Sequence, residues 1–149
     1  MQVQVENWAD CLPELLKLFP LLWEDVAVDK DRFRAECDQD KYATIDSLGI
    51  FHLVTAREAK QLVGYFLVLV QPNPHYKGQG LMAFTDMYYL LPEFRGGGNS
   101  LKLFSFMEKT LREKGVVKII TSHKIHRDHS RMLNFLGYNA SDVVYSKCL

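Results

Sequence analysis

The sequence lacks the features that mark secreted, membrane-spanning and nucleic-acid-binding proteins. It has only three cysteines in 149 residues, and their positions show neither metal-ligand spacing nor a disulfide pattern. The chain does not begin with a basic stretch followed by an apolar one, and its longest apolar runs are only strand-sized. The formal net charge is zero, which disfavours binding to nucleic acid or anionic membranes through bulk charge. We therefore expect a cytoplasmic protein with no nucleic acid and no membrane partner.

The sequence does contain enough apolar material for one hydrophobic core. Hydrophobic residues make up 48% of the 149 residues, and this length is typical of one domain. No repeat, low-complexity tract or linker interrupts the chain. We expect a single domain over residues 1–149.

The hydrophobic pattern alternates between strand-like and helix-like segments. The first helix is expected to begin at Asp10 and end at Pro20, and a second to begin at Asp29. Further helices are expected after residue 99 and over 128–135. Strands are expected at residues 3–5, 50–57, 62–70, 81–91, 116–121 and 143–145. The resulting order, β-α-α-β-β-β-α-β-α-β, predicts a mixed α/β domain.

A glycine-rich turn lies between an expected strand and an amphipathic helix. It reads Arg95-Gly96-Gly97-Gly98-Asn99-Ser100. Successive glycines let the backbone approach a ligand closely, and the start of the helix adds unpaired N–H groups and a positive dipole end. Arg95 adds a formal charge. The turn fits a phosphate or pyrophosphate site, although a flexible connection would explain the glycines alone equally well. Its spacing matches neither a Walker P-loop nor a dinucleotide-binding motif.

Arg95 and Gly98 fit the Arg/Gln-x-x-Gly-x-Gly/Ala signature, with Ser100 where Gly or Ala is usual. Three other segments, 62–65, 91–96 and 136–138, resemble the "Val-Gly", "Pro-Glu-x-Arg-Gly" and "Leu-Gly-Phe" motifs of the same proteins, in the same order. On these motifs the chain resembles the GNAT superfamily of N-acetyltransferases over essentially its whole length. It is also similar to phage and prophage members in segments 74–76 and 143–145 and at Asp86.

The resemblance implies a mostly antiparallel central sheet that is splayed between its fourth and fifth strands, and acetyl-CoA (coenzyme A) as the cofactor. It implies that the cofactor's pyrophosphate lies on the glycine-rich turn and that its pantetheine arm pairs with the fourth strand like an extra strand. His126 occupies the position where the superfamily often has an Asn beside the cofactor. The implied cofactor-binding residues are Tyr89, Leu90, Leu91, Arg95, Gly96, Gly97, Gly98, Asn99, Ser100 and His126.

The implied activity is that of an acyltransferase, which moves an acetyl group from acetyl-CoA to a primary amine of a small molecule or a protein. An alkylammonium must lose a proton before it attacks, and Asp86, alone in an apolar strand, is the candidate base or ammonium-binding group. A structural aspartate satisfied by its neighbours is the alternative. His75 and Tyr76, in the loop before this strand, are candidates for the acceptor site, with a plain surface loop as the alternative.

The proton donor for the leaving thiolate is less well defined. Many superfamily members use a tyrosine four residues before the glycine of "Leu-Gly-Phe", and this sequence has Leu133 there. Tyr145 and His126 are the candidate replacements, together with His129 and Ser130, and water is a further source of the proton. The spacing of the nearby histidines is not that of a metal site, so no metal is expected.

The alternative hypothesis is that the protein is not an enzyme but a catalytically inactive GNAT fold. Such a protein would bind acyl-CoA or a partner protein, for example as a phage accessory protein. The substitutions at Leu133 and Ser100 favour this reading, and the intact turn from Arg95 to Gly98 implies cofactor binding in either case. GNAT proteins are often dimers, so the resemblance also leaves a homodimer open.

Overall fold

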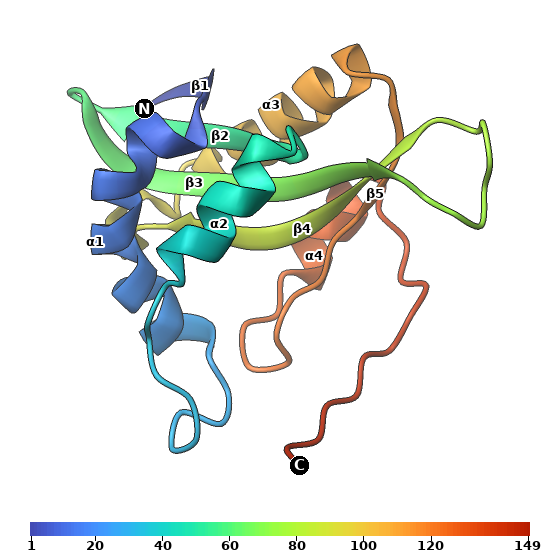
Figure 1. Ribbon diagram of the computed structural model, residues 1–149. Coiled ribbons are helices and arrows are strands. Elements are labelled where there is room, and N and C mark those ends of the chain that lie inside the picture. Colours follow the sequence, from blue (N-terminus) through green and yellow to red (C-terminus); the bar gives the residue numbers. More distant parts are fainter.

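The computed structural model describes residues 1–149 as one twisted sheet with helices on both faces (Figure 1). None of the helices is both long and apolar enough to cross a bilayer. The strands are β1 (Gln2–Glu6), β2 (Phe51–Glu58), β3 (Gln61–Pro72), β4 (Leu81–Leu90) and β5 (Val116–Ile120). The helices are α1 (Trp8–Val26), α2 (Gln39–Ser47), α3 (Asn99–Glu113) and α4 (Ser130–Phe135), with a 3-10 turn, η1 (Pro92–Phe94), after β4.

The sheet has the strand order β1-β2-β3-β4-β5, and every pair is antiparallel except the parallel pair β4–β5. The predicted mixed α/β class and mostly antiparallel sheet are confirmed. β5 pairs only with the first part of β4, from Leu81 to Phe84. The two strands separate beyond that point, which agrees with the predicted splay and leaves the second half of β4 without a neighbour on that side.

A β-bulge lies in β4 where this separation begins. Leu67 of β3 pairs with Met87, and Val68 pairs with Thr85, so Asp86 is the extra residue on the bulged strand. A bulge bends the strand and redirects a side chain. The Asp86 side chain faces α2, where it accepts a hydrogen bond from Tyr42.

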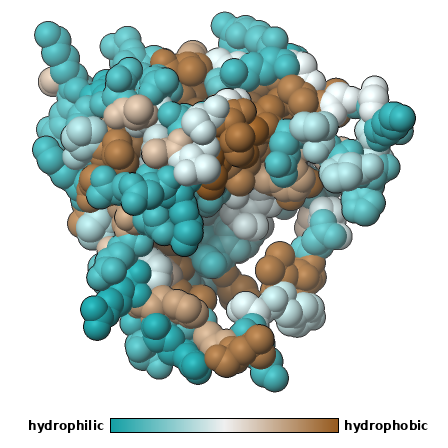
Figure 2. Space-filling model, in the orientation of Figure 1, coloured by the Kyte–Doolittle hydropathy of each residue, from teal (hydrophilic) through white to brown (hydrophobic).

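Two apolar clusters form the core, one on each face of the sheet. On one face, Trp8 and Leu15 of α1 pack in a cluster with Tyr65 of β3. α2 lies beside α1 (Figure 1). α3 packs on the other face, where Leu103 and Phe104 contact β-strand residues. On the face seen in Figure 2, hydrophobic side chains gather in the upper middle and again near the lower edge, with hydrophilic side chains between and around them. The two sheet faces are thus covered by separate helices. The second half of β4 lies between α1 on one face and α3 on the other.

The helix boundaries on the α1 face differ from the sequence expectation. α1 continues through Pro20 to Val26, because Leu22 extends the buried stripe of Leu15 and Leu18. This packing offsets the backbone hydrogen bond that the proline removes. The expectation of a loop after Pro20 was therefore wrong. The second helix begins at Gln39 instead of Asp29, with Asp38 as its N-cap.

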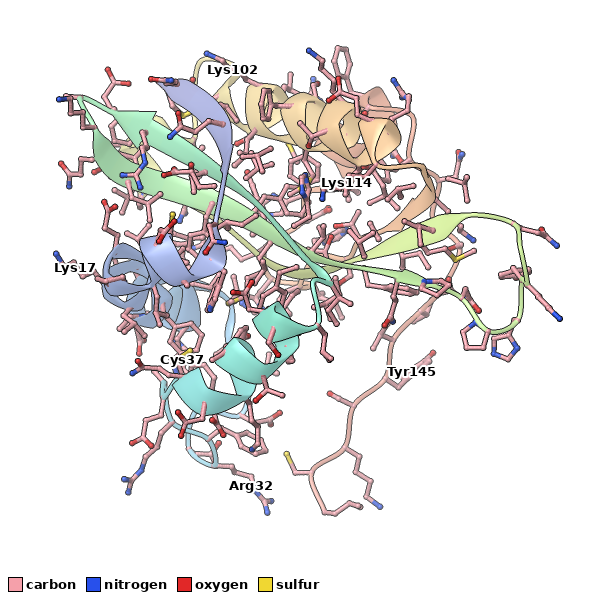
Figure 3. The ribbon with its side chains drawn as sticks, turned by 45° about the horizontal axis from the view of Figure 1, so that its top comes forward. Lys17, Arg32, Cys37, Lys102, Lys114 and Tyr145 are labelled. Carbon is pink, nitrogen blue, oxygen red and sulfur yellow. The ribbon has the colours of Figure 1, made fainter.

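The expected last strand at residues 143–145 does not form. Val143, Val144 and Tyr145 are 77%, 82% and 90% exposed in an extended tail (Figure 3). Three β-forming residues between polar neighbours bury too little area to offset the entropy of ordering them. The outer edge of β5 is consequently unpaired.

Candidate functional site

The glycine-rich turn has the backbone conformation that its sequence predicts. Gly97 and Gly98 have φ values of 63° and 80°, which residues with a Cβ rarely adopt. Gly98 is the N-cap of α3 and offers no side chain to cap the helix. No neighbouring atom lies where a Cβ would be added, so crowding does not explain these glycines. Glycine is needed here for the backbone conformation that leads the chain into α3.

Several amides at this turn have no acceptor in the protein. The N–H group of Asn99 bonds to the carbonyl of Gly96, and that of Lys102 bonds to the carbonyl of Gly98. The amides of Gly96, Gly97, Gly98, Ser100 and Leu101 donate to neither a backbone nor a side-chain acceptor. Unpaired N–H groups at the start of a 15-residue helix form a site with a preference for anions.

Arg95 lies beside these amides and is held in place by several contacts. Its Nε donates to the carbonyl oxygen of Leu90 at 2.7 Å, and its guanidinium lies 5.4 Å from the centre of the Tyr89 ring. One Nη atom is also paired with the carboxylate of Asp25. The guanidinium therefore has a fixed position at the entrance to α3.

A pocket of about 570 Å³ opens next to the turn. It lies among the end of α1, the second half of β4, the start of α3 and the segment from Arg127 into α4. Its lining combines aromatic and aliphatic groups with three arginines. The lining residues are Asp25, Val26, Tyr88, Tyr89, Leu90, Arg95, Gly98, Ser100, Leu101, Arg127, Asp128, His129, Arg131, Met132 and Phe135.

The backbone of β4 presents only some of its groups to this pocket. The N–H of Leu91 bonds to Val63 of β3, and its carbonyl accepts from Phe94, so Leu91 has no free backbone group for an added strand. Backbone groups alternate in direction along a strand. Those of Leu90 and Tyr88 therefore point to the open side, and those of Tyr89 point to β3. Of the residues expected to pair with a pantetheine arm, Leu90 has backbone groups on the open side of β4, whereas Tyr89 and Leu91 do not. Tyr88, which was not expected, also has backbone groups on that side.

Asp86 lies on the α1–α2 face, at the bulge. The hydroxyl of Tyr42 donates to its Oδ2 at 3.0 Å, and no Lys, Arg or His forms an ion pair with it. Partial burial raises the pKa of the Asp86 carboxyl above its usual range, although the hydrogen bond from Tyr42 opposes the shift. An accessible carboxylate without a cation partner is suited to take up a proton or to bind an ammonium group.

The Tyr42 partner of Asp86 belongs to an aromatic cluster, and the Cys37 thiol lies near the carboxylate. The Tyr42 ring stacks on Trp8, with ring centres 4.9 Å apart, and lies 5.7 Å from Phe51. Burial raises the pKa of the Cys37 thiol, and the negative charges of Asp38 and Asp86 raise it further. Both effects favour the thiol over the thiolate, which is the nucleophilic form of a cysteine.

The structure does not bring the other acceptor-site and proton-donor candidates together with Asp86. Tyr145 lies on the exposed tail, away from Cys37 and α2 (Figure 3). His75 and Tyr76 lie on the β3–β4 hairpin, which projects from the end of the sheet (Figure 1). These three side chains lie outside the pocket lining.

The histidines before α4 take different positions. His126 does not line the pocket; its Nε2 lies 3.2 Å from the backbone oxygen of Asp25. His129 does line the pocket, with its ring edge-on to Tyr88 at 6.1 Å, and burial lowers its pKa. His123 lies 3.4 Å from Asp128. No cluster of three or more metal-ligating side chains is present.

Sequence reasoning missed several polar residues of the site: Tyr42, Asp25 and Arg127, together with Asp128 and Arg131 of the pocket lining. Tyr42 lies in a polar helix, and nothing in its local pattern distinguishes it from a surface residue. Asp25 fell in an expected loop. Arg127 directly follows His126, and nothing in its local pattern marked it as part of the site.

Comparison of the fold identifies similar solved structures, whereas no family model and no curated protein matches the sequence. An aminoglycoside acetyltransferase from an uncultured soil metagenomic sample matches with a TM-score of 0.76 at 15% identity, over 99% of this chain and 95% of that one. Glucosamine-6-phosphate N-acetyltransferase from Arabidopsis thaliana matches with 0.72 at 14% identity, over 99% and 97%.

Ribosomal-protein-alanine N-acetyltransferase from Brucella melitensis matches with a TM-score of 0.69 at 16% identity, over 99% of this chain and 98% of that chain. The three enzymes act on different acceptors according to their names, so the common feature is the architecture. Together with the splayed β4–β5 pair and the glycine-rich turn, these matches show that the chain has the fold of the GNAT acetyltransferases.

Proposed function

We propose that this protein is an N-acetyltransferase that moves an acetyl group from acetyl-CoA to a primary amine of a small molecule or a protein. One observation carries the proposal. Residues with unpaired amides at the start of α3, the guanidinium of Arg95 and the second half of β4 line the same pocket. A site for a diphosphate is thus continuous with an edge suited to an extended amide chain.

The residues present fit coenzyme A. The amides of Gly97, Gly98 and Ser100 would hold the diphosphate, because no protein group accepts their hydrogen bonds. Arg95 would add the Nη1 group, which is bonded neither to Leu90 nor to Asp25. The outward backbone groups of Tyr88 and Leu90 would pair with the pantetheine arm, although the Leu90 carbonyl already accepts from Arg95. When bound, the thioester supplies an activated acyl carbon.

Asp86 has the position and chemistry for the acceptor side. It lies at the bulge, where β4 and β5 separate, on the sheet face opposite α3. Its carboxylate would take the proton that the ammonium must lose, directly or through water. The nitrogen then forms its bond to the acyl carbon as the carbon–sulfur bond breaks, and it releases its second proton to water, which balances the proton that the leaving sulfur takes up. Holding the two reactants within reach supplies much of the rate.

The proton for the leaving sulfur would come from water. Leu133 stands where many related enzymes have a tyrosine, and Tyr145, which is 90% exposed and does not line the pocket, is not placed to replace it. The pocket is open to solvent, so a water molecule can reach the thiolate without a dedicated side chain.

The test is release of free thiol from acetyl-CoA against a panel of amines, with calorimetry for coenzyme A binding. We expect binding, and thiol release that depends on the amine. Arg95→Ala should weaken coenzyme A binding at least tenfold, and Lys17→Ala, on the outer side of α1, serves as the matched loss of charge. Absence of coenzyme A binding at millimolar ligand would overturn the proposal. Tight binding without turnover on any amine would instead favour an acyl-CoA-binding module.

A further inference from the structure

Asp25 joins three parts of the chain at the pocket that we assign to the diphosphate. Its carboxylate pairs through Oδ2 with Arg95 and through Oδ1 with Arg127, the latter at 2.6 Å. Its backbone oxygen lies 3.4 Å from the Nε of Arg127 and 3.2 Å from His126. These partners are 70 or more residues away in sequence, so the contacts are purely tertiary.

The position of this carboxylate is electrostatically unfavourable without its partners. Asp25 is the last residue but one of α1, and the C-terminal end of a helix carries partial negative charge. The side chain is only 21% exposed, and α1 has no basic residue in its last turn. The two guanidinium groups therefore compensate both the carboxylate and the helix end.

The two arginines keep hydrogen-bonding capacity after these contacts. Arg95 uses Nε for Leu90 and one Nη atom for Asp25, and Arg127 uses Nε and one Nη atom for Asp25. Nη1 of each guanidinium has no protein acceptor. Because Oδ1 and Oδ2 belong to one carboxylate, the two guanidinium groups are fixed next to each other in the pocket lining.

Resting on the proposed function, we propose that Asp25 is a positioning residue and Arg127 a second phosphate-binding arginine. Asp25 holds Arg95 and Arg127 as a pair whose free Nη1 atoms bind the diphosphate of coenzyme A, beside the amides of the glycine-rich turn. Arginine side chains lose substantial rotamer entropy when they bind an anion, and prior fixation by a carboxylate reduces that loss.

Positioning by Asp25 and simple electrostatics predict opposite changes in coenzyme A affinity when the carboxylate is neutralised. Asp25 is itself negative, so a purely Coulombic account requires tighter binding of a diphosphate once the carboxylate is neutralised. If the carboxylate positions the two arginines, its neutralisation weakens binding instead. The direction of the change therefore separates the two accounts.

The experiment is titration of coenzyme A into the full chain and its variants by calorimetry. We expect Asp25→Asn to weaken binding at least fivefold. Glu24→Gln, the same charge change at the neighbouring residue, whose carboxylate pairs with Lys30, should leave affinity within twofold. Equal or tighter binding by Asp25→Asn would overturn the inference. If the unaltered protein does not bind coenzyme A, the proposed function itself fails, so the two failures are distinguishable.

Arg127→Gln alone keeps the test valid if Asp25→Asn is poorly folded, and the double variant measures the coupling between the two residues. Arg127→Gln should also weaken coenzyme A binding at least fivefold, and in Arg127→Gln the added Asp25→Asn change should cost less than it does alone. Inorganic pyrophosphate, used as the competitor, should lose affinity in the same variants. Independent losses from the two substitutions, or unchanged pyrophosphate affinity, would show that Asp25 does not act through Arg127.

Discussion

The Tyr42 hydroxyl donates a hydrogen bond to the Asp86 carboxylate across 44 residues of sequence, at 3.0 Å. This contact ties α2 to the β4 bulge, and it fixes the side chain that we assign as the base. The hydrogen bond stabilises the charged form of the carboxylate, whereas burial stabilises the neutral form. The reactivity of Asp86 therefore depends on both its strand and a residue of a separate helix.

Asp86→Asn should lower kcat at least a hundredfold and change coenzyme A affinity by less than threefold. The amide keeps the shape of the side chain but cannot accept the proton of the ammonium. Steady-state kinetics and calorimetry check the two quantities, with Asp31→Asn, on the exposed α1–α2 segment, as the control. An unchanged rate with a good acceptor would dismiss the catalytic role.

Tyr42→Phe should move the acid limb of the kcat/KM profile to higher pH. The base works only when deprotonated, so the rate rises with pH through the pKa of Asp86. Loss of the hydrogen bond from Tyr42 removes the interaction that lowers this pKa. The pH profile of the variant is compared with that of Tyr76→Phe, which alters a tyrosine of the hairpin. A shift to lower pH, or none, would contradict our assignment of the pair.

Gly98→Ala should destabilise the fold by about 1–2 kcal/mol, because a residue with a Cβ is strained at a φ of 80°. It should also weaken coenzyme A binding, since the amide of residue 98 belongs to the proposed site. Chemical denaturation and calorimetry measure the two effects. Gly96→Ala is the matched control, because Gly96 has no positive φ and no atom near its added Cβ. Equal effects at both positions would contradict the conformational argument.

The buried histidine of β2 should make stability depend on pH. His52 is 3% exposed, its Nε2 lies 2.8 Å from the Thr110 hydroxyl, and burial, with a contribution from Lys114, lowers its pKa from 6.5 to about 4. Between these values the unfolded chain binds a proton that the folded protein does not. The free energy of unfolding should therefore fall as pH drops from 6.5 to 4, by up to about 3 kcal/mol.

Urea unfolding at several pH values checks this expectation. His52→Leu should flatten the dependence over that range, whereas His75→Leu, at an exposed position, should retain it. His129 also has a lowered pKa, so some dependence will remain in both variants. Identical curves for the two variants would exclude His52 as the main cause.

Sequence reasoning predicted the parts of the site that are local in the chain. The glycine-rich turn is one short segment, and its φ values follow from residue type, so its position and backbone conformation could be anticipated, whereas its binding of a cofactor stays a prediction. Asp86 was identifiable as an isolated charge in an apolar strand. The partners of these groups, Tyr42 and Asp25, depend on tertiary packing and have no local signal.

The wrong expectations have the same origin. Pro20 ends a helix by local rules, but burial of Leu22 against the sheet extends α1 to Val26. Residues 143–145 have strand-forming side chains, but a strand also requires a partner and an apolar surface to cover. Local preference was overridden in one case and insufficient in the other.

The point where β5 stops pairing with β4, after Phe84, affects which amino-acid substitutions the protein can accept. The separation there is set by backbone pairing instead of by the shape of any side chain. Side chains on α2 and the segments around it can therefore be substituted while the two strands part at the same place. On the proposed function, a change of acceptor would then require changes in those segments, with the strands themselves left intact.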